Sequence, residues 1–343
     1  MKISICFPQY NRIAYLLKSL NLISKQSYDN IEIIISDDAS TDNTEHVINT
    51  LSKTYKYPIV YYKHQINVGY DRNYRSSIEL ASGDYCFILG NDDSLNQSDS
   101  ITKLVNIIKL RNYPDIGFCN YVEENNTNIF TRAHITSILG SGPDTALKYY
   151  SCFSFVAGLI YKRKTFICYN TDIFDNSIYA QIAIGVNIII SGGVLFSIND
   201  ALVIKDLKID GETVNSYKDF INKKWSNYKE IDGGLKQVID VLVRVFKEQN
   251  LLNNHYLLKI YRKIYRNTYP YWVLDYKHNN ALPAAVGLIH GLQPWKNKSF
   301  SSLKNLSKFE IIITWFSVSI LSILFPETIF FKYKNYIYKF FKR

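Results

Sequence analysis

The sequence predicts an α/β fold with a mostly parallel central sheet, followed by a helical and basic C-terminal region. Three observations support this prediction. Short apolar runs alternate with helical patterns over residues 1–121, polar residues follow several of those runs, and the character of the chain changes near residue 216. Strands of about five residues that alternate with helices are typical of βαβ units, whose sheets are mostly parallel.

The elements are expected in the following order. Strands are expected at residues 3–7, 31–35, 59–62, 85–89 and 116–121, and helices at 13–20, 72–82 and 104–110. Residues 122–215 contain strand-like stretches at 155–161 and 194–198 and a helix-like stretch at 177–190. We therefore expect one domain over residues 1–215, a helical region with a basic helix near Lys259–Arg266 over 216–308, and a separate tail over 309–343.

Composition and charge narrow the classes of function. The chain has 343 residues, of which 47% are apolar and 20% charged, so it is expected to fold. Its formal net charge of +10 indicates an anionic partner, such as nucleic acid, a phosphorylated ligand or a membrane surface. Scattered cysteines without a CxxC pair argue against a disulfide framework and a zinc site, and indicate a reduced, cytosolic protein.

The tail combines apolar, aromatic and basic residues. Residues 311–325, IIITWFSVSILSILF, carry no charge, but this stretch of 15 residues is shorter than the roughly 20 that span a bilayer. The last segment carries five cations and no acid: Lys332, Lys334, Lys339, Lys342 and Arg343. This pattern predicts a helix that lies in the interface of an anionic membrane. The alternative is a buried C-terminal helix with a solvated basic end.

Two pairs of adjacent carboxylates follow expected strands. Asp92 and Asp93 end the stretch FILGNDDSL, where they could cap the next helix or hold a divalent cation. Asp37 and Asp38 precede a turn that accounts for Ser40–Asp42 but not for the pair itself. A carboxylate at this edge of a sheet can accept a hydrogen bond from a nucleobase or a ribose hydroxyl. No GxGxxG or GxxxxGK[ST] motif is present, so we expect phosphate to be handled through a metal ion.

The motifs around these residues occur in a recognisable order. They are Phe7-Pro8-Gln9-Tyr10-Asn11-Arg12, Ile35–Asp42, Asn67-Val68-Gly69 with Asn73, and Ala81–Tyr85 leading to Asn91-Asp92-Asp93. In this order they resemble the family 2 glycosyltransferases of the GT-A fold, a Rossmann-like fold, and in particular bacterial O-antigen and capsule sugar transferases of the abequosyltransferase-like group. The resemblance covers residues 1–120 and, less closely, residues up to 215.

The resemblance implies roles for particular residues. Asp38 would contact the nucleobase, and Asp92 and Asp93 would form the DxD-type pair that bridges ribose and Mn²⁺ or Mg²⁺, with Asp93 as the direct ligand. Arg72 could reach the diphosphate, or could simply be a solvated helix residue. The implied donor-binding residues are Pro8, Tyr10, Asn11, Asp37, Asp38, Asn67, Gly69, Arg72, Asn91 and Asp92.

The resemblance also implies the reaction, which is sugar transfer from a nucleotide-diphosphate sugar to an acceptor hydroxyl with inversion at the anomeric carbon. The base should be an acid on the acceptor side. Asp175 is our candidate, although it could instead cap the helix expected at residue 177. Asp172 is the fallback, and residues 206–212 could contribute.

The implied partners are a nucleotide-sugar donor, a saccharide acceptor linked to a polyprenyl diphosphate, and an anionic membrane surface. No nucleic acid is expected, because paired carboxylates repel phosphates unless a metal ion intervenes. The protein would then be cytoplasmic and peripheral at the inner face of the cell membrane.

Other functions are disfavoured but stay open. A nucleotidyltransferase would show a glycine-rich N-terminal loop, and a processive polysaccharide synthase would show long membrane spans and a QxxRW box. A non-catalytic, membrane-peripheral scaffold or a binding protein for anionic ligands would use the basic C-terminal half.

Overall fold

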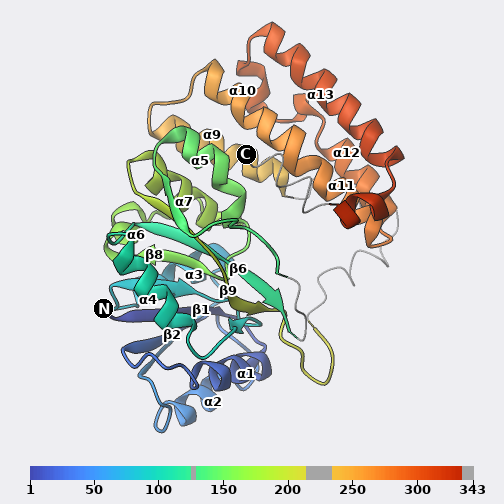
Figure 1. Ribbon diagram of the computed structural model, residues 1–343. Coiled ribbons are helices and arrows are strands. Elements are labelled where there is room, and N and C mark those ends of the chain that lie inside the picture. The colour runs from blue at the N-terminus through green and yellow to red at the C-terminus, as the bar shows by residue number, and fades with distance from the viewer. Residues whose placement is uncertain (125–128, 214–233, 334–343) are drawn as a thin grey trace. The chain divides into compact units, whose positions relative to one another are not determined.

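The computed structural model describes residues 1–124, 129–213 and 234–333 (Figure 1). The chain divides into two compact units, Met1–Val214 and Asn215–Arg343. The boundary expected at residue 215 and the last ten residues of the expected tail, 334–343, lie outside the described residues.

The first unit is built on one sheet, whose strands run in the order β3-β2-β1-β4-β8-β6-β9-β5, with β7 paired to β9. The strands are β1 (Ile3–Gln9), β2 (Ile31–Asp37), β3 (Ile59–Lys63), β4 (Tyr85–Ile88), β5 (Ser94–Leu95), β6 (Ile116–Glu123), β7 (Ser137–Gly140), β8 (Leu159–Lys162) and β9 (Leu195–Lys205). Its helices are α1 (Ile13–Ile23), α2 (Thr44–Leu51), α3 (Tyr70–Glu79), α4 (Ser100–Leu110), α5 (Pro143–Tyr149), α6 (Arg163–Tyr169) and α7 (Ala180–Ile190).

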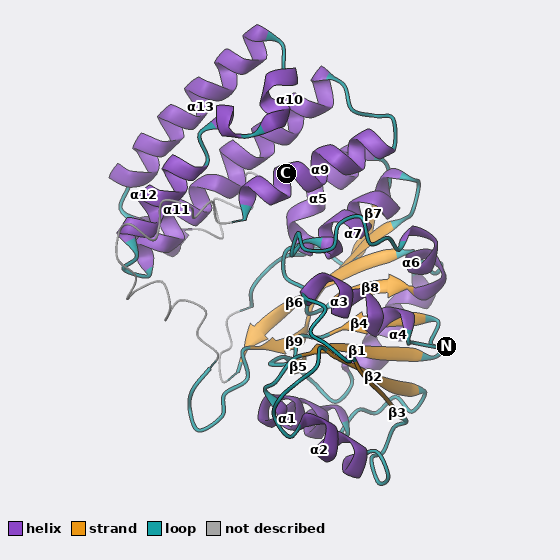
Figure 2. Ribbon diagram, turned by 180° about the vertical axis from the view of Figure 1, so that it is seen from behind, coloured by secondary structure: helices purple, strands orange, loops and turns teal. Residues whose placement is uncertain are grey.

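The half of the sheet formed by β3, β2, β1 and β4 is parallel throughout. Apolar side chains of β1 and β2 fill both faces, which is why these strands read as nearly continuous apolar runs. Ile3, Ile5 and Phe7 pack in one cluster with residues of α1 and α4. The helix α3 lies on the opposite face (Figures 1 and 2). The carboxyl ends of these strands therefore meet at one edge of the sheet.

The other half of the sheet is mixed. The strand β8 is antiparallel to both β4 and β6, and β9 is parallel to β6. Of the strand expected at 155–161, only the part from Leu159 onward pairs with neighbours, and the helix expected at 177–190 begins at Ala180. Residues 155–158 instead form a loop that leads into β8 at the edge where the parallel strands end.

The second unit is helical, as expected. It contains α9 (Leu235–Glu248), α10 (Asn254–Lys263), a π-helical turn (Ile264–Thr268), α11 (Tyr269–His278), α12 (Leu282–Gly291) and α13 (Asn305–Leu324). Tyr261, Tyr265 and Tyr269 are fully buried in it, and Arg262 and Arg266 both pair with Glu310 of α13. The tyrosines of the expected basic helix therefore belong to the core and are not available to stack on bases.

The helix α13 has two different sides. Ser307, Ile311, Ser319 and Ser322 are buried, whereas Leu306, Phe309, Phe316 and Leu324 are more than half exposed. The helix begins six residues before the uncharged stretch expected from the sequence, and its 20 residues make it long and apolar enough to cross a membrane by length and composition.

Candidate active site

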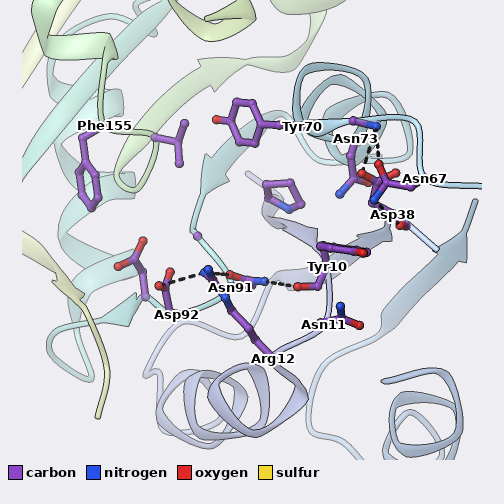
Figure 3. Close-up of a pocket in the computed structure, with 15 residues that line it drawn as sticks. Tyr10, Asn11, Arg12, Asp38, Asn67, Tyr70, Asn73, Asn91, Asp92 and Phe155 are labelled. Carbon is purple, nitrogen blue, oxygen red and sulfur yellow. Dashed lines mark hydrogen bonds and ion pairs between the residues drawn. The ribbon is translucent and has the colours of Figure 1, made fainter. Parts of the chain in front are cut away.

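A pocket of about 590 Å³ lies where β1, β2 and β4 end (Figure 3). Ligands of open α/β sheets bind at this edge, because the loops that follow parallel strands meet there. The pocket is lined by Pro8, Tyr10, Asn11, Arg12, Asp38, Asn67, Gly69, Tyr70, Asn73, Gly90, Asn91, Asp92, Asp93, Phe155 and Val156. Most of the donor-binding residues predicted from the sequence are therefore together.

The loop after β1 is held by the turn after β2. Asn11 and Arg12 are both in the left-handed region, with φ of 52° and 61°. The side-chain oxygen of Asn11 accepts from the backbone N–H of Thr41 (2.9 Å). The backbone N–H of Asn11 donates to Ser40 Oγ (2.7 Å). The backbone N–H of Ile13 donates to Asp42 (3.0 Å). The residues assigned to a turn, Ser40–Asp42, thus also shape the floor of the pocket.

Asp38 shapes a second wall. Its two carboxylate oxygens accept from the backbone N–H groups of Val68 (2.6 Å) and Gly69 (3.1 Å). The loop that carries Asn67 and Gly69 therefore stays against the end of β2. Asn73 of α3 donates to the backbone oxygen of Gln9 (3.0 Å), which ties the start of α3 to β1.

Asp37 does not line the pocket. It is fully buried, and Tyr61 Oη (2.5 Å), Ser40 N (2.9 Å) and Ser40 Oγ (2.5 Å) all donate to its carboxylate. Its role in this structure is to fix the turn beneath the pocket. The two carboxylates of this pair therefore serve different purposes: Asp37, the last residue of β2, fixes the turn, whereas Asp38 holds the loop that carries Gly69.

Asp92 and Asp93 lie at the opposite side of the pocket and belong to the loop after β4. Burial raises the pKa of Asp93 well above its ordinary value, and the charge of Asp92 adds to the rise. Burial also raises the pKa of Asp92, while the Arg12 guanidinium opposes that rise. Asp93 accepts from the backbone N–H of Asp206 (3.1 Å), so the segment 206–212 lies beside the pair.

The carboxylate pair fits a hard divalent cation. Among the described residues no group of three or more His, Cys, Asp or Glu side chains is placed to hold a metal ion. Mg²⁺ and Mn²⁺ are nevertheless commonly held by one or two carboxylates, with phosphate oxygens and water as the other ligands. The buried Asp93 and the partly buried Asp92, both with raised pKa values, match that incomplete ligand set. A cation beside these two carboxylates would relieve their repulsion.

The cation predicted to reach the diphosphate, Arg72, is placed differently from the expectation. Arg72 does not line the pocket, because its Nη1 pairs with Glu79 (2.7 Å) at the far end of α3. Arg12 lines the pocket and reaches toward Asn91 and Asp92 (Figure 3). Its Nη1 lies 3.2 Å from both Asn91 Oδ1 and Asp92 Oδ2.

Asp175 also lies outside the set of pocket-lining residues. Both of its oxygens accept from Arg75, through Nε (2.9 Å) and Nη2 (2.5 Å). The fallback residue, Asp172, is exposed on the same loop. This loop does approach the pocket rim, because a Cβ on Gly69 would lie 3.9 Å from Asn176 Oδ1.

One wall of the pocket was not predicted from the sequence. Phe155 and Val156 lie in a loop that Arg132 holds by donating to the backbone oxygens of Cys152, Phe155 and Ala157. These two residues lie far along the chain from the other motifs, and no pattern in the sequence marked them as part of a site. Tyr70 and Gly90, by contrast, directly follow or precede motif residues and could have been included.

Comparison with known proteins identifies the family. Residues 4–174 match glycosyl transferase family 2. Abequosyltransferase RfbV of Salmonella typhimurium is 46% identical over 125 residues, which are 36% of this chain and 37% of that protein. A GalNAc(5)-diNAcBac-PP-undecaprenol beta-1,3-glucosyltransferase of Campylobacter jejuni is 32% identical over 94 residues, which are 27% of this chain and 30% of that protein. The chain thus spans about a third of the length of these curated relatives.

The fold has a counterpart among solved structures. The crystal structure of S. aureus TarS 1-349 superposes with a TM-score of 0.59 at 14% identity, covering 94% of this chain and 91% of that one. This likeness confirms the expected fold class, an α/β GT-A-type fold followed by a helical region. All the residues that line the pocket fall within residues 4–174, and the chain belongs to glycosyl transferase family 2.

Proposed function

We propose that the protein transfers a sugar from a nucleotide-diphosphate sugar to a hydroxyl of a saccharide, in the synthesis of a bacterial surface polysaccharide. One observation carries this proposal. One pocket at the carboxyl edge of the sheet joins a polar wall around Asp38 to the carboxylate pair of Asp92 and Asp93, within the residues that match the family. Such a pocket suits a ligand with a nucleoside at one end and phosphates at the other.

The proposed roles follow from where the side chains lie. Pro8, Tyr10 and Asp38 would hold the nucleoside, and Asp92 and Asp93 would hold Mn²⁺ or Mg²⁺. When bound, the ion would neutralise charge on the departing diphosphate. The wall formed by Phe155 and Val156 would exclude water from the reacting sugar. Attack on the side of the anomeric carbon opposite the diphosphate would invert its configuration.

The general base is proposed from the loop at the pocket rim. Asp175 lies one residue before Asn176, which approaches Gly69 of the pocket. Both Asp175 oxygens are engaged by Arg75, so accepting a proton from the acceptor hydroxyl would require at least one of these contacts to open. Arg75 would then orient the base, much as buried partners orient other catalytic carboxylates.

The acceptor is proposed to be a saccharide linked to a polyprenyl diphosphate at the inner face of the cell membrane. The name of the C. jejuni relative includes such a lipid, undecaprenol. The exposed apolar side of α13 supports a peripheral position on an anionic membrane, because basic residues such as Lys304, Lys308 and Lys332 accompany it.

The proposed function is tested by calorimetric titration of the protein with UDP, GDP, CDP and dTDP, each with and without Mn²⁺. UDP is included also because S. aureus TarS is described in complex with UDP. We expect one nucleotide to bind with a dependence on Mn²⁺ that Asp93→Asn abolishes. The control Asp99→Asn changes a carboxylate near the start of α4 that does not line the pocket, and it should bind as the wild type does. Binding of no nucleotide under any condition would contradict the proposal.

A further inference from the structure

Arg12 is the only cationic residue among the described residues that line the pocket. The same pocket holds three carboxylates, those of Asp38, Asp92 and Asp93. A diphosphate brings additional negative charge into this space, so its binding requires positive charge from the protein or from a metal ion. Arg12 is the side chain of the described pocket wall that can supply it.

The backbone of Arg12 is fixed independently of its side chain. Arg12 is the residue before α1 and has φ 61° and ψ 35°, a left-handed conformation that costs a non-glycine residue about 1 kcal/mol. Contacts from Ser40, Thr41 and Asp42 to residues 11 and 13 hold the chain in that conformation. The loop therefore aims Arg12 at the pocket even though the guanidinium takes no part in holding it.

The side chain itself is only lightly engaged. Arg12 Nη1 makes both of its contacts, each at 3.2 Å, and the side chain is 42% exposed. Within the described part of the chain, Nε and Nη2 make no hydrogen bond. A guanidinium has five N–H donors in a planar fork that matches phosphate oxygens. Arg12 thus has donors to spare beside the carboxylate pair.

The neighbouring arginines of α3 are engaged differently. Arg72 is paired with Glu79, and Arg75 donates to Asp175, Glu79 and Asn170. The side chain of Arg75 is only 6% exposed. Neither residue lines the pocket. Moving either guanidinium to a ligand would leave acidic side chains without their present partners.

We propose that Arg12 binds the diphosphate of the donor, using the N–H donors that its contacts with Asn91 and Asp92 leave free. This inference rests on the proposed function and adds to it a direct phosphate contact that needs no metal ion. Arg12 thereby makes the protein bind nucleoside diphosphates more tightly than nucleoside monophosphates, because the guanidinium recognises the additional charge of the second phosphate.

The test compares matched nucleotide pairs in the presence of EDTA, so that no metal ion contributes. UDP and UMP, GDP and GMP, CDP and CMP, and dTDP and dTMP are titrated calorimetrically into the wild type and into Arg12→Asn. Asparagine tolerates the left-handed backbone conformation, so the variant removes the charge without new strain. We expect Arg12→Asn to weaken binding of the preferred diphosphate about 10-fold or more, and binding of its monophosphate far less.

Two further variants sharpen the result. Arg12→Lys keeps the charge but loses the planar fork, and should lie between the wild type and Arg12→Asn. Arg72→Ala, the matched control outside the pocket, should leave both affinities unchanged. Equal weakening of diphosphate and monophosphate, no weakening, or an effect of Arg72→Ala would each overturn the role given to Arg12. Binding of the wild type only when Mn²⁺ is present would also overturn that role, because the contact is proposed to need no metal ion. If the wild type binds none of these nucleotides, even with Mn²⁺ added, the proposed function itself fails.

Discussion

Gly90 sets how closely the carboxylate pair lies against the end of β4. A Cβ at this position would collide with Asp93 Oδ2 and come within 3.3 Å of Asp92 Oδ1. At the scale of single residues, then, the stretch FILGNDDSL contains a glycine because the carboxylates of Asp92 and Asp93 occupy the space that any other side chain would fill. The sequence suggested a site here from Asp92 and Asp93, but the reason for the glycine is visible only in three dimensions.

Gly90→Ala should displace Asp93 and weaken Mn²⁺-dependent nucleotide binding about 10-fold or more, measured by calorimetry. Gly117→Ala is a suitable control. It crowds Phe196 within the sheet, away from the pocket, and should lower the thermal midpoint without changing the affinity. A Gly90→Ala protein that loses stability but keeps its affinity would show that the position of Asp93 does not matter for binding.

Glu32 is a second residue whose importance the sequence did not reveal, since it merely interrupts the apolar run of β2. It is buried and accepts from Ser4 Oγ (2.6 Å), Ser82 N (2.7 Å) and Ser82 Oγ (2.8 Å), and it pairs with Lys2 (2.6 Å). Burial alone would raise its pKa, but the hydrogen bonds from Lys2, Ser4 and Ser82 outweigh burial and lower the pKa to about 2.

This shift predicts a dependence of stability on pH. Because the pKa of Glu32 is lower in the folded than in the unfolded chain, its contribution is complete above about pH 5 and is lost as the pH falls toward 2. Glu32→Gln should lower the free energy of unfolding by about 3 kcal/mol at pH 7, and the difference should shrink below pH 4.5. Urea unfolding followed by circular dichroism measures it, with the exposed Asp29→Asn as control. A difference independent of pH would contradict the assignment.

At the scale of elements, the loop 171–178 is held to α3 at two points. Asp71 accepts from the backbone N–H groups of Ile178 (2.7 Å) and Ala180 (3.0 Å), and Arg75 binds Asp175. The periodicity of the sequence predicted both α3 and α7, but not that the start of α7 is capped by a residue 109 positions earlier in the chain. Local patterns predict elements, whereas contacts of this kind depend on how the elements pack.

The variant Asp175→Asn tests whether Asp175 is the general base or only holds the loop 171–178 in place. If Asp175 is the base, the variant lowers kcat for the donor identified by calorimetry by about 10²-fold or more and leaves nucleotide affinity unchanged. Arg75→Lys, which keeps the carboxylate and a charge beside it, should retain most of the kcat. If both variants lower the thermal midpoint equally and lower kcat equally, Asp175 only positions the loop and the base must be sought elsewhere.

At the scale of the whole molecule, the chain joins two units of different character. The first follows rules that a sequence expresses directly, because polar residues after parallel strands converge at one edge of the sheet. The second reads as basic and aromatic, yet its tyrosines form the core, and hydrogen bonds such as Tyr269 Oη to Ser319 Oγ (2.6 Å) attach α13 to α11. Which side of a helix faces its neighbours was not predictable for α13, since apolar residues occur all round it.

The contacts of α13 with its neighbours favour the proposed position on a membrane surface over a helix that crosses the bilayer. Lys277 of α11 donates to the backbone oxygens of Ile323 (2.8 Å) and Phe325 (2.7 Å) at the end of α13, and Arg262 binds Glu310 near its start. A helix that crossed the bilayer would have to abandon these contacts or carry charged partners into the hydrocarbon region. We therefore expect α13 to lie in the interface with its exposed apolar side toward the lipid.

The last prediction tests this orientation. The double variant Phe309→Glu/Phe316→Glu places two charges on the exposed side of α13, where both phenylalanines are about 60% exposed and neither belongs to the buried core. It should abolish sedimentation with vesicles of phosphatidylcholine and phosphatidylglycerol, whereas Leu110→Glu, at an exposed apolar position on α4, should not. Carbonate at high pH should release the wild type from cell membranes. Retention in carbonate would indicate a spanning helix, and unchanged sedimentation of the double variant would remove α13 from the membrane contact.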